Sequence, residues 1–268
     1  MGSKPTLVIA ECANTWRFGS DELANACRLI ESVKQCGADA AKFQWTSDPA
    51  LMAERRHGKR EEFEILAWPA EWMPKLKEHC DKAGIEFMCT VFLAKDIPVV
   101  ALLVKRFKVA SAESSDRAFT ERLFDGRPVY VSHAFGERPA YNHKNVFSLA
   151  CVCAYPTPIE QANLRRIASD GFDGYSDHTT SVLTGALCVA AGGTIVEKHV
   201  RLMETPYENP DFPHSLVANC NCGSFDNGEC TACFRKYTEN IREAELAMGN
   251  GRNEVQECEK PFESRRVK

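Results

Sequence analysis

Apolar runs of about six residues alternate with segments whose apolar positions recur at helical spacing along most of the chain. The short runs are rich in Val, Ile and Phe, which predicts buried strands. The predicted strands are Thr6–Cys12, Ala40–Trp45, Glu86–Phe92, Phe107–Ser111, Pro128–Ala134, Val146–Tyr155, Phe172–Asp177 and Thr194–Val200. The predicted helices are Asp21–Gly37 (with Ser20 as its N-cap), Ala70–Gly84, Ala94–Val104, Ala118–Asp125, Ile159–Ala168, Ser181–Ala191 and Phe234–Met248. This alternation predicts an α/β fold, a (β/α)8 TIM barrel. A doubly wound open sheet is the competing interpretation, but no Gly-x-Gly-x-x-Gly follows a predicted strand.

One repeat of this pattern is too short. Only Phe135–Asn145 separate the fifth and sixth predicted strands, and they include Pro139. This length does not accommodate two loops and a full crossover helix. We therefore expect the helix after the fifth strand to be missing or reduced to a single turn.

Composition and charge narrow the functional class. The chain has 268 residues and a net charge of −4, and no basic stripe is interleaved with aromatic residues, so we expect no nucleic-acid partner. No apolar run approaches the roughly twenty residues of a membrane span, and the first apolar run is too short for a signal peptide. We expect a cytoplasmic protein without a membrane partner, whose 13 cysteines are mostly small buried side chains.

Two histidines end consecutive predicted strands. His178 follows Phe172–Asp177 and His199 lies in Thr194–Val200, with a predicted helix between the two strands. In a parallel βαβ unit both imidazoles fall at the carboxyl ends of the strands, where α/β folds hold their chemistry. Two such ligands suit a divalent ion with open positions for water and substrate. The alternative is two unrelated histidines, one in the core and one on the surface.

The other predicted strands also end in polar residues. Lys42 and Lys108 at these positions need an anionic partner if they are buried. The serines at 111, 132 and 176 add hydroxyl donors that suit a phosphate group. Together these residues predict a pocket for a small phosphorylated ligand that also carries a carboxylate. Taken singly, each is more simply read as a solvated loop or turn residue.

Several segments resemble the N-acetylneuraminate (sialic acid) synthase family. They are Ala41–Gln44, Phe107–Ser111, Ala154–Pro158, Gly174–Thr179 and Glu197–His199, in matching order and spacing. The resemblance covers nearly all of residues 6–262. It implies a TIM barrel that condenses phosphoenolpyruvate with an amino-sugar or related aldose, giving a 2-keto-3-deoxy sugar acid and phosphate.

The resemblance also implies a role for individual residues. His178 and His199 would bind catalytic Mn²⁺ or Mg²⁺, and Glu113 would handle a proton near the reacting carbons. The residues implied to bind phosphoenolpyruvate are Lys42, Thr90, Lys108, Ser111, Ser132 and Ser176. Those implied to face the sugar are Glu11, Gln44, Tyr155 and Asp211. In this scheme the metal polarises the aldehyde and C3 of phosphoenolpyruvate attacks it; water then adds at C2 and phosphate leaves.

The C-terminal part departs from the family pattern. We expect a catalytic domain over residues 1–249 and a tail over 250–268 that resembles the linker to an antifreeze-like domain, which is lacking here. In the family an arginine of that domain reaches the sugar site of the partner subunit. We therefore expect an altered acceptor. The alternatives to this are a separately encoded lid, a chain cut before that domain, and lost activity. Whether the chain forms a homodimer is left open.

A cysteine-rich loop follows the eighth predicted strand, within residues 214–233. Its cysteines, spaced C-x-C-x7-C-x2-C, are Cys220, Cys222, Cys230 and Cys233. Four thiolates at this spacing predict a structural Zn²⁺, and His214 could replace a weak ligand. Free thiols or a redox pair are the alternatives.

Two other functions fit the same residues. One is a metal-dependent lyase or hydrolase acting on a phosphorylated keto acid. The other is a barrel kept as a non-catalytic binding module. The sugar-acid synthase, a C–C bond-forming transferase of carbohydrate biosynthesis, remains the leading hypothesis.

Overall fold

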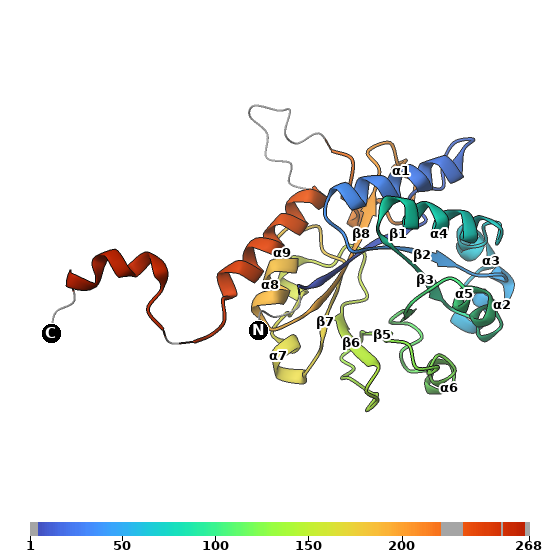
Figure 1. Ribbon diagram of the computed structural model, residues 1–268. Coiled ribbons are helices and arrows are strands. Elements are labelled where there is room, and N and C mark those ends of the chain that lie inside the picture. The colour runs from blue at the N-terminus through green and yellow to red at the C-terminus, as the bar shows by residue number, and fades with distance from the viewer. Residues whose placement is uncertain (1–4, 221–232, 253, 266–268) are drawn as a thin grey trace.

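Eight parallel strands form a closed barrel in the computed structural model, which describes residues 5–220, 233–252 and 254–265 (Figure 1). Each strand pairs with the next in the chain, and β1 pairs with β8 to close the ring. The strands are β1 (Leu7–Ala13), β2 (Ala40–Trp45), β3 (Glu86–Val91), β4 (Phe107–Val109), β5 (Val129–His133), β6 (Val146–Cys151), β7 (Gly174–Asp177) and β8 (Ile195–Arg201). The predicted TIM barrel is confirmed.

Helices cover the outside of the barrel. They are α1 (Glu22–Gln35), α2 (Pro49–Arg56), α3 (Arg60–Phe63), α4 (Trp72–Ala83), α5 (Ile97–Ala101), α6 (Arg117–Glu121), α7 (Arg166–Asp170), α8 (Thr184–Ala190) and α9 (Phe234–Met248). The N-cap of α1 is Asp21, whose carboxylate accepts a hydrogen bond from the Ala24 amide at 3.1 Å. The prediction of Ser20 was one residue early.

The segment after β2, in which the sequence pattern predicts no helix, contains α2 and α3. Asp48 accepts a hydrogen bond from the Leu51 amide at 3.0 Å, and Pro49 occupies the first turn of α2. An Asp-Pro pair is a helix-start signal, because the carboxylate caps a free amide and proline fixes a helical φ. The charged residues that follow obscured the signal.

Other differences lie at element ends. The strands predicted to reach Ser111 and Tyr155 end at Val109 and Cys151. The helix predicted over Ile159–Ala168 is a 3-10 turn, Ile159–Gln161, followed by α7.

The connection between β5 and β6 contains no helix among residues 134–145, all of which are described, so the predicted deletion is confirmed. The Tyr141 side chain packs where the missing helix would lie, with its ring 6.2 Å from that of Phe124. Asn145 secures the end of the connection by donating a hydrogen bond to the Gly126 carbonyl at 2.8 Å. The outer layer of helices is therefore interrupted between β5 and β6.

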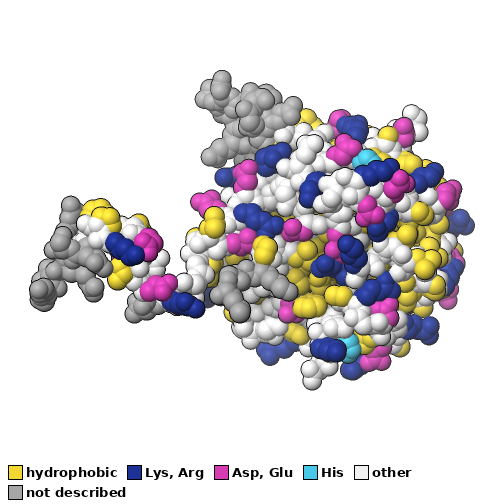
Figure 2. Space-filling view, viewed as in Figure 1, with side chains coloured by type: hydrophobic (Ala, Val, Ile, Leu, Met, Phe, Trp, Pro, Cys, Tyr) yellow, Lys and Arg dark blue, Asp and Glu magenta, His cyan; other side chains and the backbone are white. Residues whose placement is uncertain are grey.

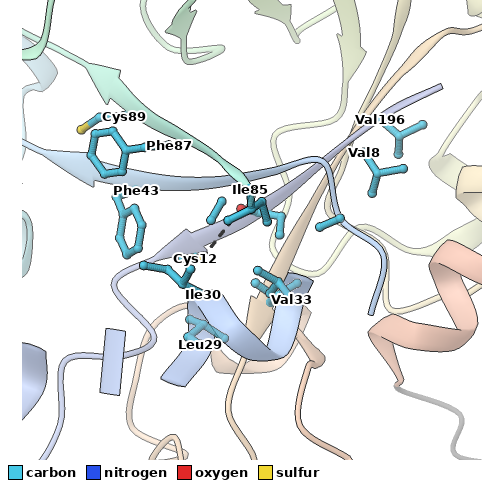
Figure 3. Packing of buried hydrophobic residues seen from close by; sticks show 14 of the residues in the cluster. Val8, Cys12, Leu29, Ile30, Val33, Phe43, Ile85, Phe87, Cys89 and Val196 are labelled. Atoms are coloured by element: carbon cyan, nitrogen blue, oxygen red, sulfur yellow. Dashed lines mark hydrogen bonds between the residues drawn. The ribbon is translucent and has the colours of Figure 1, made fainter. Parts of the chain in front are cut away.

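The main core lies between the barrel and its helices. Figure 3 shows Leu29, Ile30 and Val33 of α1 directed at the β-strands, with Phe43 and Phe87 stacked at 5.8 Å nearby. Burying each such side chain contributes about 1.5–3 kcal/mol to folding. A second, smaller layer fills the lower interior of the barrel with Ile9, Ala40, Met88, Tyr130, Leu149 and Ile195. The interior above this layer is polar and forms the site.

The C-terminal helix α9 packs on α8, and a 3-10 segment, Glu257–Arg265, then extends away from the barrel (Figure 1). Figure 2 shows acidic and basic side chains interspersed over the face in view. Among the described residues, no helix combines the length and apolar character that a membrane crossing requires.

Candidate active site

A polar cavity of about 330 Å³ opens at the carboxyl ends of the barrel strands. Strand register explains its composition, because Glu11 pairs with Lys42 on one side and with His199 on the other. Its lining comprises Glu11, Lys42, Gln44, Arg56, Thr90, Lys108, Ala110, Ser111, Ser132, Cys151, Tyr155, Ser176, His178, Glu197, His199, Pro210, Asp211 and His214.

Two buried lysines share one carboxylate at the base of the cavity. The Glu197 oxygens lie 3.5 Å from Lys42 Nζ and 3.5 Å from Lys108 Nζ. Lys42 also pairs with Glu11 and donates to Thr90 Oγ1 at 2.6 Å. The anionic partners expected for the buried lysines are therefore present in the protein itself, as Glu197 and Glu11.

Hydroxyl groups complete this network. Lys108 donates to Ser132 Oγ at 2.8 Å, and Ser176 Oγ donates to Glu197 Oε1 at 2.9 Å. Burial raises the cost of a charge on Glu197, but Lys108 and Lys42 outweigh it and lower the pKa of Glu197 to about 2. Burial lowers the pKa of Lys108. For Lys42 the effect of burial is overcome by Glu11 and Glu197, which raise its pKa.

Imidazoles occupy the opposite side of the cavity. His178 and His199 have ring centroids 5.4 Å apart, and His214 lies 4.4 Å from His199. His178 Nδ1 is 2.7 Å from the Val152 carbonyl, to which it donates, so Nε2 carries a free lone pair. Burial lowers the pKa of His178 to about 4, which keeps the ring neutral and able to bind a metal.

Some nitrogens of these rings have no hydrogen-bond partner, which bears on whether the site fits a metal ion. Within the described part of the chain, His199 Nδ1 and both ring nitrogens of His214 are buried without a hydrogen-bond partner. Buried polar atoms are normally paired, and neutral imidazole nitrogens are good ligands for divalent transition metals. The residues present therefore suit a divalent ion.

Comparison with known proteins identifies the family. Residues 29–253 match the NeuB family. The chain belongs to the NeuB family. It is 30% identical over 92% of its length to an uncharacterised protein of Methanocaldococcus jannaschii, of which the match covers 73%. It is also 28% identical over 95% of its length to pseudaminic acid synthase of Campylobacter jejuni, covering 78% of that protein.

The fold has a similar solved relative. An N-acetylneuraminic acid (sialic acid) synthetase from Leptospira borgpetersenii, crystallised with citrate, superposes with a TM-score of 0.79 at 23% identity. The superposition covers 98% of this chain and 91% of the other. The family resemblance found in the sequence is confirmed by the family match, and the barrel fold by this superposition.

The structure brings most of the sequence-predicted site residues into the cavity. The residues predicted for the catalytic ion, for phosphoenolpyruvate and for the sugar all line it. Tyr155 lies at the rim with 49% of its surface exposed. Glu113 is the exception, since it is buried behind the wall and both of its oxygens lie 2.6 Å from Arg56 Nη2.

Three lining residues with a carboxylate, guanidinium or imidazole group had no place in the predicted site. Glu197 lies two positions before His199 on β8, and this period-2 spacing already placed both on one strand face. Arg56 ends α2, a helix that the sequence pattern did not predict. His214, expected as a substitute ligand of the cysteine loop, lies in the cavity instead.

The cysteine loop lies mostly outside the described residues, which include neither Cys222 nor Cys230. The sulfur atoms of Cys220 and Cys233 lie 2.9 Å apart at the two ends of that segment. The structural Zn²⁺ remains a prediction.

Proposed function

We propose that this NeuB-family chain condenses phosphoenolpyruvate with an amino-sugar or related aldose, releasing phosphate and forming a 2-keto-3-deoxy sugar acid. The observation that carries the proposal is the single cavity in which Lys42, Lys108 and three serine hydroxyls face a cluster of imidazoles. Its two halves match the two substrates, a charged enol phosphate and an aldehyde that must be polarised.

The lysine half suits phosphoenolpyruvate. Lys42 and Lys108 are held in place by Glu197, so little side-chain entropy is lost when an anion binds. Lys108 with Ser132 would bind one anionic group, and Lys42 with Thr90 the other. Ser111 and Ser176 lie in the same wall and supply further hydroxyl donors.

The imidazole half suits a divalent ion, Mn²⁺ or Mg²⁺, held by His178 and His199. When bound, such an ion polarises a carbonyl oxygen as a Lewis acid. The Val152 carbonyl fixes the tautomer of His178, so the protein orients this ligand before any ion arrives.

The remaining residues position the acceptor and a proton. Gln44, Tyr155 and Asp211 line the outer cavity, where the sugar hydroxyls would lie, and Glu11 contacts Gln44 Nε2 at 3.2 Å. Glu113 is the residue proposed to handle a proton. It lies behind Arg56, and burial raises its pKa although Arg56 opposes this. C3 of phosphoenolpyruvate attacks the aldehyde carbon, water adds at C2, and collapse of that adduct expels phosphate.

We also propose that the protein acts in a reducing compartment, the cytoplasm. Barrel cysteines such as Cys12, Cys80 and Cys188 are buried free thiols, which is usual for intracellular proteins.

The test is phosphate release from phosphoenolpyruvate with Mn²⁺ and a panel of N-acylated and plain aldoses, with mass spectrometry of the product. We expect release only when an aldose is present, and a product whose mass equals aldose plus pyruvate. Lys108→Gln should abolish release, whereas Lys105→Gln, which changes an exposed lysine three residues earlier, should not. Release without any aldose would contradict the proposal and indicate a hydrolase.

A further inference from the structure

A third imidazole lies against the two histidines assigned to the metal. His214 is 2% exposed, and its ring centroid is 4.4 Å from that of His199 and 6.3 Å from that of His178. Imidazoles that bind one ion through bonds of about 2.1 Å have ring centroids within roughly 6.4 Å of each other. The His199 and His214 rings lie well within this span, whereas the His178 ring is near its limit and its nitrogens do not join the cluster of ligand atoms described below.

The carboxylate of Asp211 lies between two of these rings. Asp211 Oδ1 is 3.5 Å from His199 Nδ1 and 3.3 Å from His214 Nε2. Ligand atoms that share one ion at bonds of about 2.0–2.2 Å stand roughly 3–3.6 Å apart. The three residues form a cluster whose potential ligand atoms lie within 4.8 Å of one another.

Packing alone does not account for His214. Within the described residues both of its ring nitrogens lack a hydrogen-bond partner, as does His199 Nδ1. Leaving a buried polar atom unpaired costs about 1–3 kcal/mol, which an apolar side chain in the same place would avoid. An ion that accepts these lone pairs removes the cost.

The loop that carries His214 is fixed in place. Asn209 donates to the Asn14 carbonyl at 3.0 Å, and Ser215 Oγ donates to the Asp211 carbonyl at 2.6 Å. The short strand β9 (Leu216–Val217) then pairs with β8 directly after the 3-10 turn Phe212–His214. This anchoring directs His214 into the cavity instead of into solvent.

We propose that His214 is a ligand of the divalent ion together with His199 and Asp211, and that its imidazole shifts the preference of this centre toward Mn²⁺ and away from Mg²⁺. The inference rests on the proposed function only in placing the ion in this cavity. Mg²⁺ prefers oxygen ligands and keeps its waters, whereas Mn²⁺ and the later transition metals accept imidazole more readily. Each imidazole that replaces a water therefore shifts the preference away from Mg²⁺.

The experiment measures Mn²⁺ binding by loss of the electron paramagnetic resonance signal of free Mn²⁺, without phosphoenolpyruvate or sugar. Mn²⁺ is a poor partner for thiolates, so the cysteine loop should not contribute. We expect one tight site, and Mg²⁺ should displace the ion only at large excess. His214→Gln should weaken Mn²⁺ binding by about 10–100-fold or more, the loss that even an outer-shell partner causes, and should narrow the Mn²⁺/Mg²⁺ preference. His214→Asp, which supplies a carboxylate ligand, should restore part of the affinity.

The matched control is His133→Gln. His133 is another buried histidine with unpaired ring nitrogens among the described residues, but it lies outside the cluster. We expect it to retain wild-type Mn²⁺ binding. Wild-type affinity and Mg²⁺ competition in folded His214→Gln would overturn the inference.

A spectroscopic count tests the coordination directly. Wild-type protein labelled with ¹⁵N-histidine and loaded with Mn²⁺ should show hyperfine coupling to one imidazole nitrogen more than folded His214→Gln does, and equal counts would reject His214 as a ligand. The outcomes for function are separate. Mn²⁺ binding through His214 without aldose-dependent phosphate release would reject the proposed function alone, and release with an unchanged His214→Gln site would reject this inference alone.

Discussion

Glu197 explains how two lysines can be buried side by side in an apolar barrel. Its oxygens lie 3.5 Å from each ammonium group, and Glu11 provides a second carboxylate for Lys42. Two positive and two negative groups thus balance before any substrate is present. Lys108 has the weaker compensation, because Glu197 is the acidic group within ion-pair distance of it.

This difference predicts a pH dependence of phosphoenolpyruvate binding. Burial lowers the pKa of Lys108, and the nearby Lys42 lowers it further, whereas Glu197 opposes both effects. As pH rises through this lowered pKa, Lys108 loses its proton, so affinity for the anion should fall at a lower pH than for an ordinary lysine. Losing a charge-assisted hydrogen bond of about 1.5–3 kcal/mol weakens binding by about 10-fold or more. Calorimetric titration of metal-free protein with phosphoenolpyruvate measures it.

Glu197→Gln is the companion variant for this experiment. The amide removes the charge that raises the pKa of Lys108, so the loss of affinity should move to still lower pH. Constant affinity up to the range where free lysine titrates would contradict a lowered pKa of Lys108 in the metal-free protein.

At the scale of residues, most of the cavity lining could be predicted, because strand ends and period-2 alternation are local patterns. His214 and Asp211 could not be placed together in the same way. The loop that carries them returns to the barrel through contacts such as Thr205 Oγ1 donating to the Thr15 carbonyl at 2.9 Å, about 190 residues away in the chain. No spacing in the sequence encodes such a contact.

At the scale of elements, a buried carboxylate connects the last part of the barrel. Asp177 at the end of β7 accepts hydrogen bonds from Thr184 of α8 at 2.5 Å and from Tyr237 of α9 at 3.0 Å. Lys198 of β8 lies 3.1 Å away, and both members of this ion pair are fully buried. The helices α8 and α9 are thereby fixed relative to the strands that carry His178 and His199.

Tyr237→Phe should therefore destabilise the fold while keeping its shape. Removing one donor to a buried carboxylate costs about 1.5–3 kcal/mol, so the free energy of unfolding measured in urea should fall by that amount. Tyr207→Phe is the matched control, since Tyr207 is 76% exposed, and it should have no measurable effect. Equal stability of the two variants would mean that Asp177 is satisfied without α9.

Elements were predictable where the hydrophobic period is long and unbroken, as in α1 and α9. The short helix α2 was missed because only Met52 and Ala53 are buried on it, so its period is too brief to recognise. The missing helix between β5 and β6 was predictable from chain length alone, since eleven residues cannot cross back over a strand as loop plus helix.

At the scale of the whole molecule, α9 and the described part of the segment after it differ sharply in burial. Side chains of α9 such as Phe234, Tyr237 and Ile241 are buried, whereas the described residues from Gly249 to Phe262 are exposed. Hydrogen bonds such as Asn250 Nδ2 donating to Glu254 Oε1 join residues within this segment, and the Gly249 amide donates to the Leu246 carbonyl of α9.

Ending the chain after Gly249 should therefore leave the barrel intact. Surface segments without buried contacts change stability by no more than about 0.5 kcal/mol, so the urea midpoint and the affinity for Mn²⁺ should match those of the full chain. Ending it after Cys233 instead removes α9 and exposes the apolar face of α8, including Gly185, where the Tyr237 and Ile241 side chains pack closely. That shorter chain should lose its cooperative transition. A lower midpoint for the first truncation would show that the tail folds back onto the barrel in solution, and would make the tail part of the catalytic unit.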